Sequence, residues 1–286
     1  RRGTVLPLSP FAHSPDHAMT AIDAKNISVK FGAAQILYDV VLAVETGRFV
    51  GLIGPNGSGK TTLLRSLAGL QRLAGGGVSI DGRLLTEMTD AARARKMSYM
   101  PQGTEVHWPL VVGRLVALGR IPTLNTWRGA RGPDQDAVVQ ALRAVDALHL
   151  TDRVVSNLST GERARVLLAR ALASNPGILL ADEPVASLDL NHQLLVLDVI
   201  RDLCSQGMTA VVGCHNLSLA ARYCSHLVLL HEGRVFAEGP PTDVLVPNNL
   251  RDAYGVDAVL SNDLGVPQVV SFARLDPAGD RGGGCA

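Results

Sequence analysis

The sequence predicts an α/β protein built around a glycine-rich loop, and three observations support this class. A glycine-rich loop at residues 54–61 lies between an expected strand at 48–53 and an expected helix at 62–68. The continuous apolar run at residues 178–181 is typical of a parallel strand that is covered on both faces. Between these two features, about residues 103–175 favour helices without strands. We therefore expect an α/β core that carries an all-α helical insert.

The other expected elements follow from local patterns along the chain. Residues 25–31 and 35–44 contain β-branched and alternating residues, which predicts two strands joined by a turn at Gly32 and hence an antiparallel β subdomain. The glycines of residues 74–77 predict a break. Further strands are expected at 78–80, 96–100, 208–213, 226–230 and 234–238, with one late strand, and helices at 111–119, 133–148, 162–174, 190–205, 242–246 and 248–254.

Composition narrows the class of protein. The chain has 286 residues, of which 47% are apolar and 19% charged, so one large α/β domain can form a substantial core. The net charge of +1 provides no global attraction to nucleic acid, and we expect no nucleic-acid partner. The four cysteines form no CxxC pair, which favours free thiols over zinc ligands or disulfides. No apolar run approaches the roughly 18–20 residues of a membrane span.

The glycine-rich loop has the residues that a phosphate group requires. Its glycines permit backbone angles that other residues avoid, so that the peptide N–H groups can surround an anion. The ammonium of Lys60 can lie on the terminal phosphates, and the hydroxyl of Thr61 can hold a magnesium ion. The sequence therefore predicts a nucleoside triphosphate site at Gly54, Pro55, Asn56, Gly57, Ser58, Gly59, Lys60, Thr61 and Thr62.

Two acidic residues follow the apolar strand at 178–181. A carboxylate at the carboxyl end of a buried strand beside a phosphate loop lies where a magnesium ligand is needed. We therefore interpret Asp182 as the metal-associated acid, acting through water. Glu183 points differently because it is one residue further on, and it can act as the general base for an attacking water.

At this point the sequence resembles a known family. The segment Leu158-Ser159-Thr160-Gly161-Glu162, about 20 residues before Asp182, looks like the signature motif of the ATP-binding cassette (ABC) ATPases. The resemblance implies a RecA-like core that takes ATP and Mg²⁺. It also implies a head-to-tail homodimer in which residues 159–162 face the nucleotide of the other subunit. We expect residues 1–20 to be a disordered extension, 21–240 the ABC ATPase domain, and 241–286 a short C-terminal extension with a disordered end.

Smaller motifs of the family can be matched one by one. Phe31 lies where the family stacks an aromatic ring on adenine, although a plain core position remains open. Gln102 resembles the glutamine that reaches the magnesium and the attacking water, with an ordinary loop glutamine as the alternative. His215 resembles the histidine that contacts the γ-phosphate, and its neutral imidazole can bridge to Glu183. Residues 187–189 resemble the loop that crosses the dimer interface.

Three positions depart from the family pattern. Thr160 stands where glycine is usual, Glu162 where glutamine is common, and Asn216 where an acid is frequent. The Cβ of Thr160 would cost strain only if that position required a positive φ. We expect these departures to affect the rate of turnover rather than the presence of activity.

The insert points to a subfamily. Residues 102–120 are similar to importer ATPases for iron–siderophore complexes, haem and vitamin B12. That resemblance implies two separate transmembrane permease subunits, a periplasmic substrate-binding protein and a peripheral location at the cytoplasmic face of the inner membrane. Trp108 is equally consistent with a contact to the permease and with a core position. For the arginines at 114, 120, 128 and 131, a solvated face is favoured over a docking patch.

Two other functions stay open at the level of sequence. One is a soluble ABC ATPase of translation or DNA repair, and the other is the ATPase of an ABC exporter. Against the first, the chain has one phosphate loop, no CxxC pair and no heptad run. Against the second, many exporters fuse the cassette to the membrane domain, but not all do.

Overall fold

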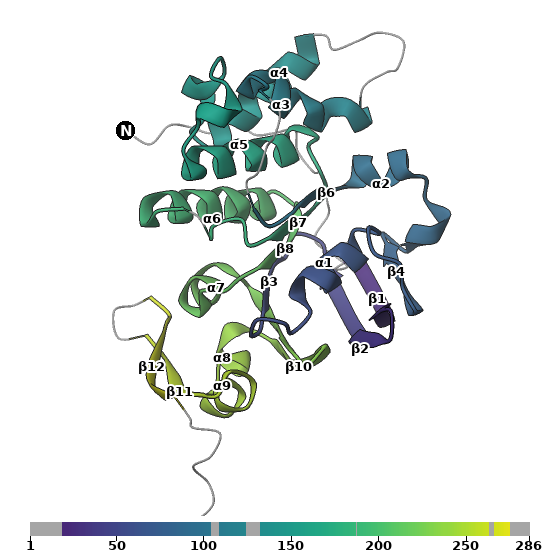
Figure 1. Ribbon diagram of the computed structural model, residues 1–286, viewed down its shortest axis with the longest axis vertical. Helices are drawn as coiled ribbons and strands as arrows, with labels where there is room; N and C mark the ends of the chain where they lie inside the picture. The colour runs from purple at the N-terminus through teal and green to yellow at the C-terminus, as the bar shows by residue number, and fades with distance from the viewer. Residues whose placement is uncertain (1–18, 104–108, 124–131, 187, 263–265, 275–286) are drawn as a thin grey trace, which may run out of the picture.

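A computed structural model describes residues 19–103, 109–123, 132–186, 188–262 and 266–274. Its centre is a six-stranded sheet with the order β10-β9-β3-β8-β7-β6 (Figure 1). The strands from β9 to β6 are parallel to their neighbours, and β10 pairs antiparallel with β9. The strands are β3 (Phe49–Ile53), β6 (Met97–Met100), β7 (Ile178–Asp182), β8 (Thr209–Gly213), β9 (His226–His231) and β10 (Arg234–Gly239).

The central strands are apolar except at two ends, Asp182 of β7 and Thr209 of β8, because both of their faces are buried. Phe49 and Ile53 of β3 pack in one hydrophobic core, whereas Val50 and Leu52 pack in the other. Successive side chains of a strand point to opposite faces, so a strand between two cores needs apolar residues throughout. The prediction of a doubly covered strand at residues 178–181 is confirmed.

A second, antiparallel sheet covers one side of the molecule and has the order β2-β1-β4-β5. Its strands are β1 (Thr20–Phe31), β2 (Ala34–Glu45), β4 (Gly75–Ile80) and β5 (Arg83–Leu84). Helix α1 (Lys60–Leu67) packs between this sheet and the central sheet, where Leu63, Leu64 and Leu67 are fully buried. The antiparallel subdomain expected from the sequence is therefore present.

The expected break at residues 74–77 is wrong, because residues 75–77 begin strand β4. Gly76 has a φ of +78°, and a Cβ atom there would lie 2.3 Å from the carbonyl oxygens of Lys25 and Asn26. Glycine is thus required by the close approach of β4 to β1 and does not mark the end of a strand.

The helical insert lies between β6 and β7 and forms the top of the molecule in Figure 1. It contains α3 (Val112–Ala117), α4 (Gly132–Ala144) and α5 (Thr160–Ala173), together with short 3₁₀ turns at residues 118–123, 148–150 and 155–157. Arg120 belongs to its interior, since its guanidinium bonds the Asp134 carboxylate at 3.0 Å and the Ala173 carbonyl at 2.9 Å. This residue therefore holds helices together, whereas Trp108, Arg128 and Arg131 lie outside the described residues.

The last third of the chain completes the sheet and adds an extension. Helix α6 (Leu190–Ser205) precedes β8, and α7 (Leu217–Tyr223) precedes β9. The extension contains α8 (Pro241–Val244), α9 (Pro247–Tyr254) and a hairpin of β11 (Val256–Ser261) and β12 (Gln268–Arg274). The sequence indicated one late strand where there are two, and it missed α7 and α2 (Asp90–Lys96).

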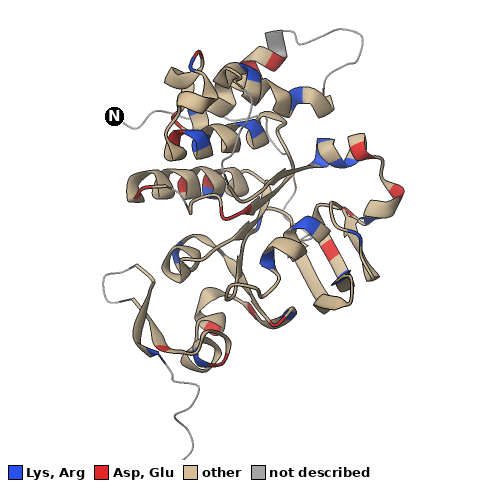
Figure 2. Cartoon of the chain, viewed as in Figure 1, with Lys and Arg blue, Asp and Glu red and all other residues tan. Residues whose placement is uncertain are grey.

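Charged residues of both signs are scattered over the elements of the chain (Figure 2). This agrees with the low net charge of the sequence. Within the described ranges, every helix is too short or too polar to cross a lipid bilayer.

Candidate functional site

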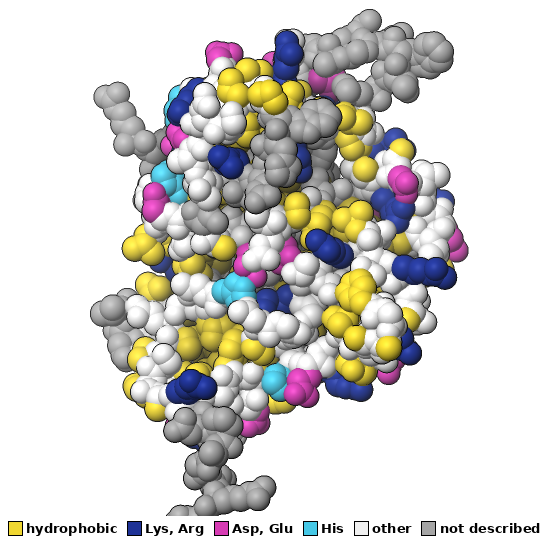
Figure 3. All heavy atoms as spheres, in the orientation of Figure 1, with side chains coloured by type: hydrophobic (Ala, Val, Ile, Leu, Met, Phe, Trp, Pro, Cys, Tyr) yellow, Lys and Arg dark blue, Asp and Glu magenta, His cyan; other side chains and the backbone are white. Residues whose placement is uncertain are grey.

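A cleft of about 540 Å³ opens beside the start of α1. Near the middle of the face shown in Figure 3, a histidine, acidic side chains and a basic side chain lie together. The cleft brings together most of the residues that the sequence predicted, together with Ile36 of β2, which it did not. The lining residues are Phe31, Ile36, Asn56, Gly57, Gly59, Lys60, Thr61, Thr62, Gln102, Glu183 and His215.

Lys60 begins helix α1 and points back into the loop that precedes it. The side chain is buried, and its Nζ donates to the carbonyl oxygens of Gly54 at 2.7 Å and Pro55 at 3.0 Å. Burial lowers the pKa of the Lys60 ammonium, while the carboxylates of Glu183 and Asp182 oppose that effect. The loop thus holds a cation at the amino end of a helix, which is suited to an anionic phosphate chain.

Asp182 ends β7 and is only 1% exposed. Among the described residues, neither of its carboxylate oxygens has a hydrogen-bond partner. A buried carboxylate without a donor is costly unless it is paired or coordinates a metal. Because Mg²⁺ takes oxygen ligands and keeps several waters, the carboxylate of Asp182 fits such an ion, as does the hydroxyl of Thr61 in the cleft lining.

Glu183 is held between two residues from neighbouring strand ends. Its Oε2 accepts a hydrogen bond of 2.7 Å from the Gln102 amide, and its Oε1 pairs with Nε2 of His215. Gln102 follows β6, Glu183 follows β7 and His215 follows β8, and these three strands are adjacent in the sheet. Parallel strands end at one edge, so the sheet delivers all three side chains to one place.

The signature segment builds the start of helix α5. The Ser159 hydroxyl accepts from the Glu162 N–H at 3.2 Å, and the Glu162 carboxylate accepts from the Ser159 N–H at 2.8 Å. This is a capping box, which satisfies the free N–H groups of a helix start. Thr160 begins the helix and is absent from the non-glycine residues with positive φ, so its Cβ costs no left-handed strain. Residues 159–162 do not line the cleft of their own chain.

Two further residues that were singled out in the sequence, Asn216 and Asp189, serve as helix caps. The Asn216 side chain accepts from the Leu219 N–H at 3.0 Å and caps α7. The Asp189 carboxylate accepts from the His192 N–H at 2.9 Å and caps α6, while Ser187 lies outside the described residues. Asparagine and aspartate are both favoured cap residues, so Asn216 keeps the cap that an acid would supply.

The C-terminal extension brings Tyr254 close to the backbone of the phosphate loop at Gly54. Tyr254 ends α9, and burial raises the pKa of its phenol, an effect that the neighbouring backbone N–H of Gly54 partly offsets. Neither Tyr254 nor Ile36 was expected at the site. A periodic pattern could place them in a helix or strand, but only the packing of that element brings them to the loop.

Comparison with known proteins agrees with this geometry. Residues 37–186, more than half of the chain, match the ABC transporter family. The chain belongs to this family. Its phosphate loop, signature segment and acidic strand end therefore lie in an ATP-binding cassette.

Curated relatives are import ATP-binding proteins. The chain is 40% identical over 243 residues to the cobalamin import ATP-binding protein of Halobacterium salinarum, covering 85% of this chain and 61% of that protein. It is 43% identical to the hemin import ATP-binding protein of Nocardia farcinica, covering 78% and 76%. It is 35% identical to the protein of Bacillus subtilis named "probable siderophore transport system ATP-binding protein", covering 90% and 94%. The chain thus spans less than two thirds of the halobacterial relative.

Solved structures share the fold. One is described as "an inward-facing conformation of a putative metal-chelate type ABC transporter", with a TM-score of 0.77, 26% identity and coverage of 89% of this chain and 98% of that chain. Another is a dimeric ATP-binding cassette in a post-hydrolysis state with ADP and phosphate, with a TM-score of 0.69, 28% identity and coverage of 77% and 98%. The α/β cassette fold is confirmed by these similarities.

Proposed function

We propose that this chain hydrolyses ATP to energise a membrane importer of metal chelates such as iron–siderophore complexes, haem or vitamin B12. The observation that carries the proposal is the cleft in which Glu183 lies between Gln102 and His215, in the same lining as Lys60 of the phosphate loop. The relatives are named for cobalamin import, hemin import and siderophore transport, and this supports the choice of cargo class.

The residues of the cleft suggest the steps of the reaction. The loop N–H groups and the Lys60 ammonium bind the phosphates, and Phe31, half exposed at the cleft, offers a ring face to adenine. Glu183 takes the proton of the attacking water, while Gln102 and His215 hold its carboxylate in position. Magnesium, held by Asp182 and Thr61, would neutralise charge on the phosphates. The water oxygen bonds to the γ-phosphorus while the bond from that phosphorus to the oxygen shared with the β-phosphate breaks, so that ADP and inorganic phosphate leave and Glu183 keeps the proton.

The proposed assembly has several partners. Residues 159–162 of a second copy would close over the nucleotide, in line with the dimeric cassette among the similar structures. Two transmembrane permease subunits would carry the cargo, and a periplasmic substrate-binding protein would deliver it. The chain would then lie at the cytoplasmic face of the inner membrane, bound to the permease through the helical insert.

Purified protein tests the enzymatic part. We expect magnesium-dependent ATP hydrolysis that falls about a hundredfold or more in Glu183→Gln, because the general base is lost. Lys60→Ala should lose both nucleotide binding and turnover. Lys96→Ala is the matched control, since Lys96 is an exposed lysine that pairs with Asp81 at 2.6 Å, and it should retain the parental rate. If Glu183→Gln hydrolysed ATP at the parental rate, Glu183 would not be the general base.

Association with a membrane tests the transport part. The chain should co-purify with a polytopic membrane subunit when it is co-expressed with a permease whose gene lies beside its own. Sedimentation with ribosomes or DNA, and never with membranes, would favour the non-transport alternative. An exporter would instead be indicated by a membrane partner that moves substrate outward in vesicles.

A further inference from the structure

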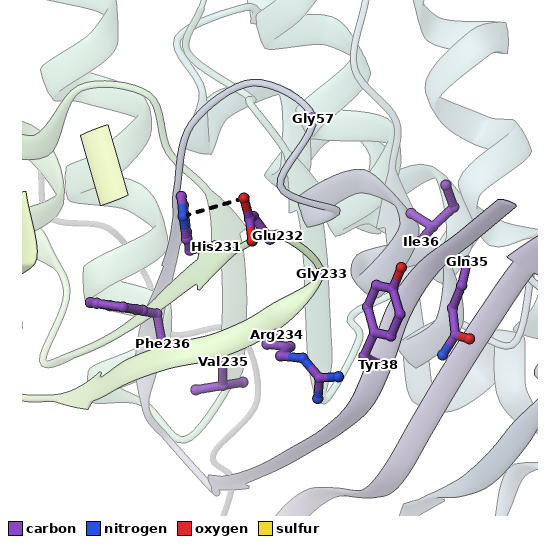
Figure 4. Close-up of a pocket in the computed structure, with 10 residues that line it drawn as sticks. All are labelled: Gln35, Ile36, Tyr38, Gly57, His231, Glu232, Gly233, Arg234, Val235 and Phe236. Atoms are coloured by element: carbon purple, nitrogen blue, oxygen red, sulfur yellow. Dashed lines mark ion pairs between the residues drawn. The ribbon is translucent and has the colours of Figure 1, made fainter. Parts of the chain in front are cut away.

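The turn of the β9–β10 hairpin touches the phosphate loop. Gly233 donates its N–H to the carbonyl oxygen of Ser58 at 3.1 Å and accepts from the N–H of Tyr38 at 2.9 Å. In Figure 4, Gly233 lies between the loop that carries Gly57 and the strand that carries Tyr38. We infer that this turn holds the phosphate loop in its binding conformation and that Gly233 is a positioning residue for ATP. The inference rests on the proposed function and deepens it.

The hydrogen bond from Gly233 sets the direction of a peptide group in the loop. The carbonyl of Ser58 and the N–H of Gly59 belong to one planar, trans peptide unit, so they point to opposite sides. With the Ser58 carbonyl bound to Gly233, the Gly59 N–H is directed away from the hairpin. Gly59 lines the cleft, where loop N–H groups are the donors for an anion. The β9–β10 turn thus orients the Gly59 N–H toward the cleft, although this donor belongs to the phosphate loop.

The same hairpin approaches the loop at a second point. A Cβ atom on Gly54 would lie only 2.2 Å from the carbonyl oxygen of Leu230, near the end of β9. The first glycine of the loop and Ser58 are therefore both held against β9 and its turn. Ser58 itself is buried, at 3% exposure. Contacts at both ends of the loop limit how far it can move as one piece.

Glycine is required at position 233 by two independent features. Its φ is +75°, and a Cβ atom would lie 2.1 Å from the carbonyl oxygen of Ile36. Any larger residue must displace the backbone of β2 at Ile36, which lines the nucleotide cleft, or lose the bond to Ser58. A displaced Ile36 alters the lining of the nucleotide cleft, and a lost bond to Ser58 frees the loop that binds the phosphates.

Side chains on the outer face reinforce the turn. The Arg234 guanidinium lies 4.8 Å from the centre of the Tyr38 ring, a cation–π contact between β10 and β2. Figure 4 shows the two side chains facing one another at the edge of a cleft of about 730 Å³. This contact lies one residue from the bond between Tyr38 and Gly233 and involves the same residue of β2, so its loss should loosen the turn without a steric clash.

The chain contains a matched control turn. Asp81 and Gly82, between β4 and β5, have φ values of +49° and +77°, against +47° and +75° for Glu232 and Gly233. A Cβ on Gly82, however, would have no atom within 4 Å. Alanine imposes a similar left-handed strain at both turns, but only at position 233 does it collide with β2.

The experiment compares Gly233→Ala, Gly82→Ala and the parental full chain. Dissociation constants for magnesium–ATP are measured by titration, KM and kcat by steady-state hydrolysis, and folding by thermal unfolding. We expect Gly233→Ala to raise the dissociation constant and KM about tenfold with kcat within about threefold, since contacts to the phosphates exist in both ground and transition states. Gly82→Ala should bind and hydrolyse ATP like the parent. Equal effects of both variants, or an unchanged KM in Gly233→Ala, would overturn the inference.

A second variant decides the matter if Gly233→Ala does not fold. Arg234→Gln removes only the guanidinium over Tyr38 and should raise the KM for ATP about threefold. A parental KM in that variant would then overturn the inference. Binding is measured without turnover, so a parent that binds ATP but does not hydrolyse it contradicts the proposed function alone. An unchanged dissociation constant in Gly233→Ala contradicts the positioning role alone.

Discussion

Glu183 has a backbone φ of +53°, a left-handed conformation that few non-glycine residues adopt. Such a conformation costs about 1–3 kcal/mol and persists only where surrounding contacts maintain it. Here the contacts come from Gln102 on one carboxylate oxygen and His215 on the other. The strain therefore lies at the residue that is proposed to act as the general base, where the orientation of the carboxylate toward the attacking water matters most.

Asp182 leads to a prediction about stability at the scale of a single residue. Its buried carboxylate has no donor among the described residues, so replacement by the neutral amide should stabilise the metal-free protein. We expect Asp182→Asn to increase the free energy of unfolding in EDTA by about 1–2 kcal/mol. We also expect it to lose the increase in melting temperature that Mg²⁺ and nucleotide produce in the parent.

Thermal unfolding in EDTA and in magnesium–ATP provides the measurement for Asp182. Asp198→Asn is the control, because Asp198 is exposed and pairs with Arg201 at 2.6 Å. Exposed pairs contribute little, about 0–1 kcal/mol. If Asp182→Asn responded to magnesium–ATP as the parent does, Asp182 would have no part in holding the metal.

Helix α5 is the element whose start departs from the family pattern and is nevertheless well built. Glu162 serves both as the acceptor for the Ser159 N–H and as the partner of the Arg153 guanidinium at 3.0 Å. The backbone N–H of Ser159 is the main cause of the lowered pKa of Glu162. The residue that looks unusual in the motif therefore stabilises the helix that carries the motif.

The cap of α5 predicts a pH dependence. Because the pKa of Glu162 in the folded protein is below its ordinary value of 4.5, its stabilisation is present above that value and fades as the pH falls through the lowered pKa. Glu162→Gln keeps an acceptor for the Ser159 N–H but cannot titrate. We expect the difference in melting temperature between parent and variant to be constant from pH 7 to about pH 5.5 and to shrink below about pH 4.

Melting temperatures of the two proteins across this pH range test the assignment. Glu87→Gln, on an exposed 3₁₀ turn, controls for the general loss of one negative charge. If the difference for Glu162→Gln kept its size down to pH 3, or matched that for Glu87→Gln at every pH, the carboxylate would not be the stabilising group.

At the scale of the whole molecule, one chain contains only part of the proposed site. The cleft includes the phosphate loop, Gln102, Glu183 and His215, whereas residues 159–162 lie outside its lining. In a head-to-tail dimer, each nucleotide would meet the loop of one chain and the signature segment of the other. A monomer should then bind ATP and hydrolyse it poorly, and Glu183→Gln should accumulate as an ATP-bound dimer.

Mixing two inactive variants tests this arrangement. Lys60→Ala damages the phosphate loop and Ser159→Arg damages the signature segment, and each homodimer should be inactive. In a mixed dimer, one site combines the damaged loop of one chain with the damaged signature segment of the other. The second site combines the intact loop with the intact signature segment and therefore has no defect. With random pairing, half of the dimers are mixed and each has one intact site, so about a quarter of the parental activity should return. Activity no greater than the sum of the separate variants would argue against shared sites.

The sequence alone determined the parts of this protein whose chemistry is local. The loop at 54–61 could be interpreted because a phosphate cradle needs glycines, a lysine and a threonine within one short segment. The burial of residues 178–181 on both faces, and the position of Asp182 at the end of that strand, also follow from neighbouring residues. Helices α2 and α7, of seven residues each, were missed because so few turns give only a weak periodic signal.

Only the tertiary structure decided which distant residues meet. Gln102 and Glu183 are 81 residues apart in the chain, and they touch because β6 pairs in parallel with β7 although the helical insert separates the two strands in the chain. Gly233 reaches Ser58 for the same reason, since β9 pairs directly with β3. The order of strands in a sheet is set by the packing of whole elements, which no local pattern encodes. The base, its two partners and the support of the phosphate loop are therefore properties of the fold.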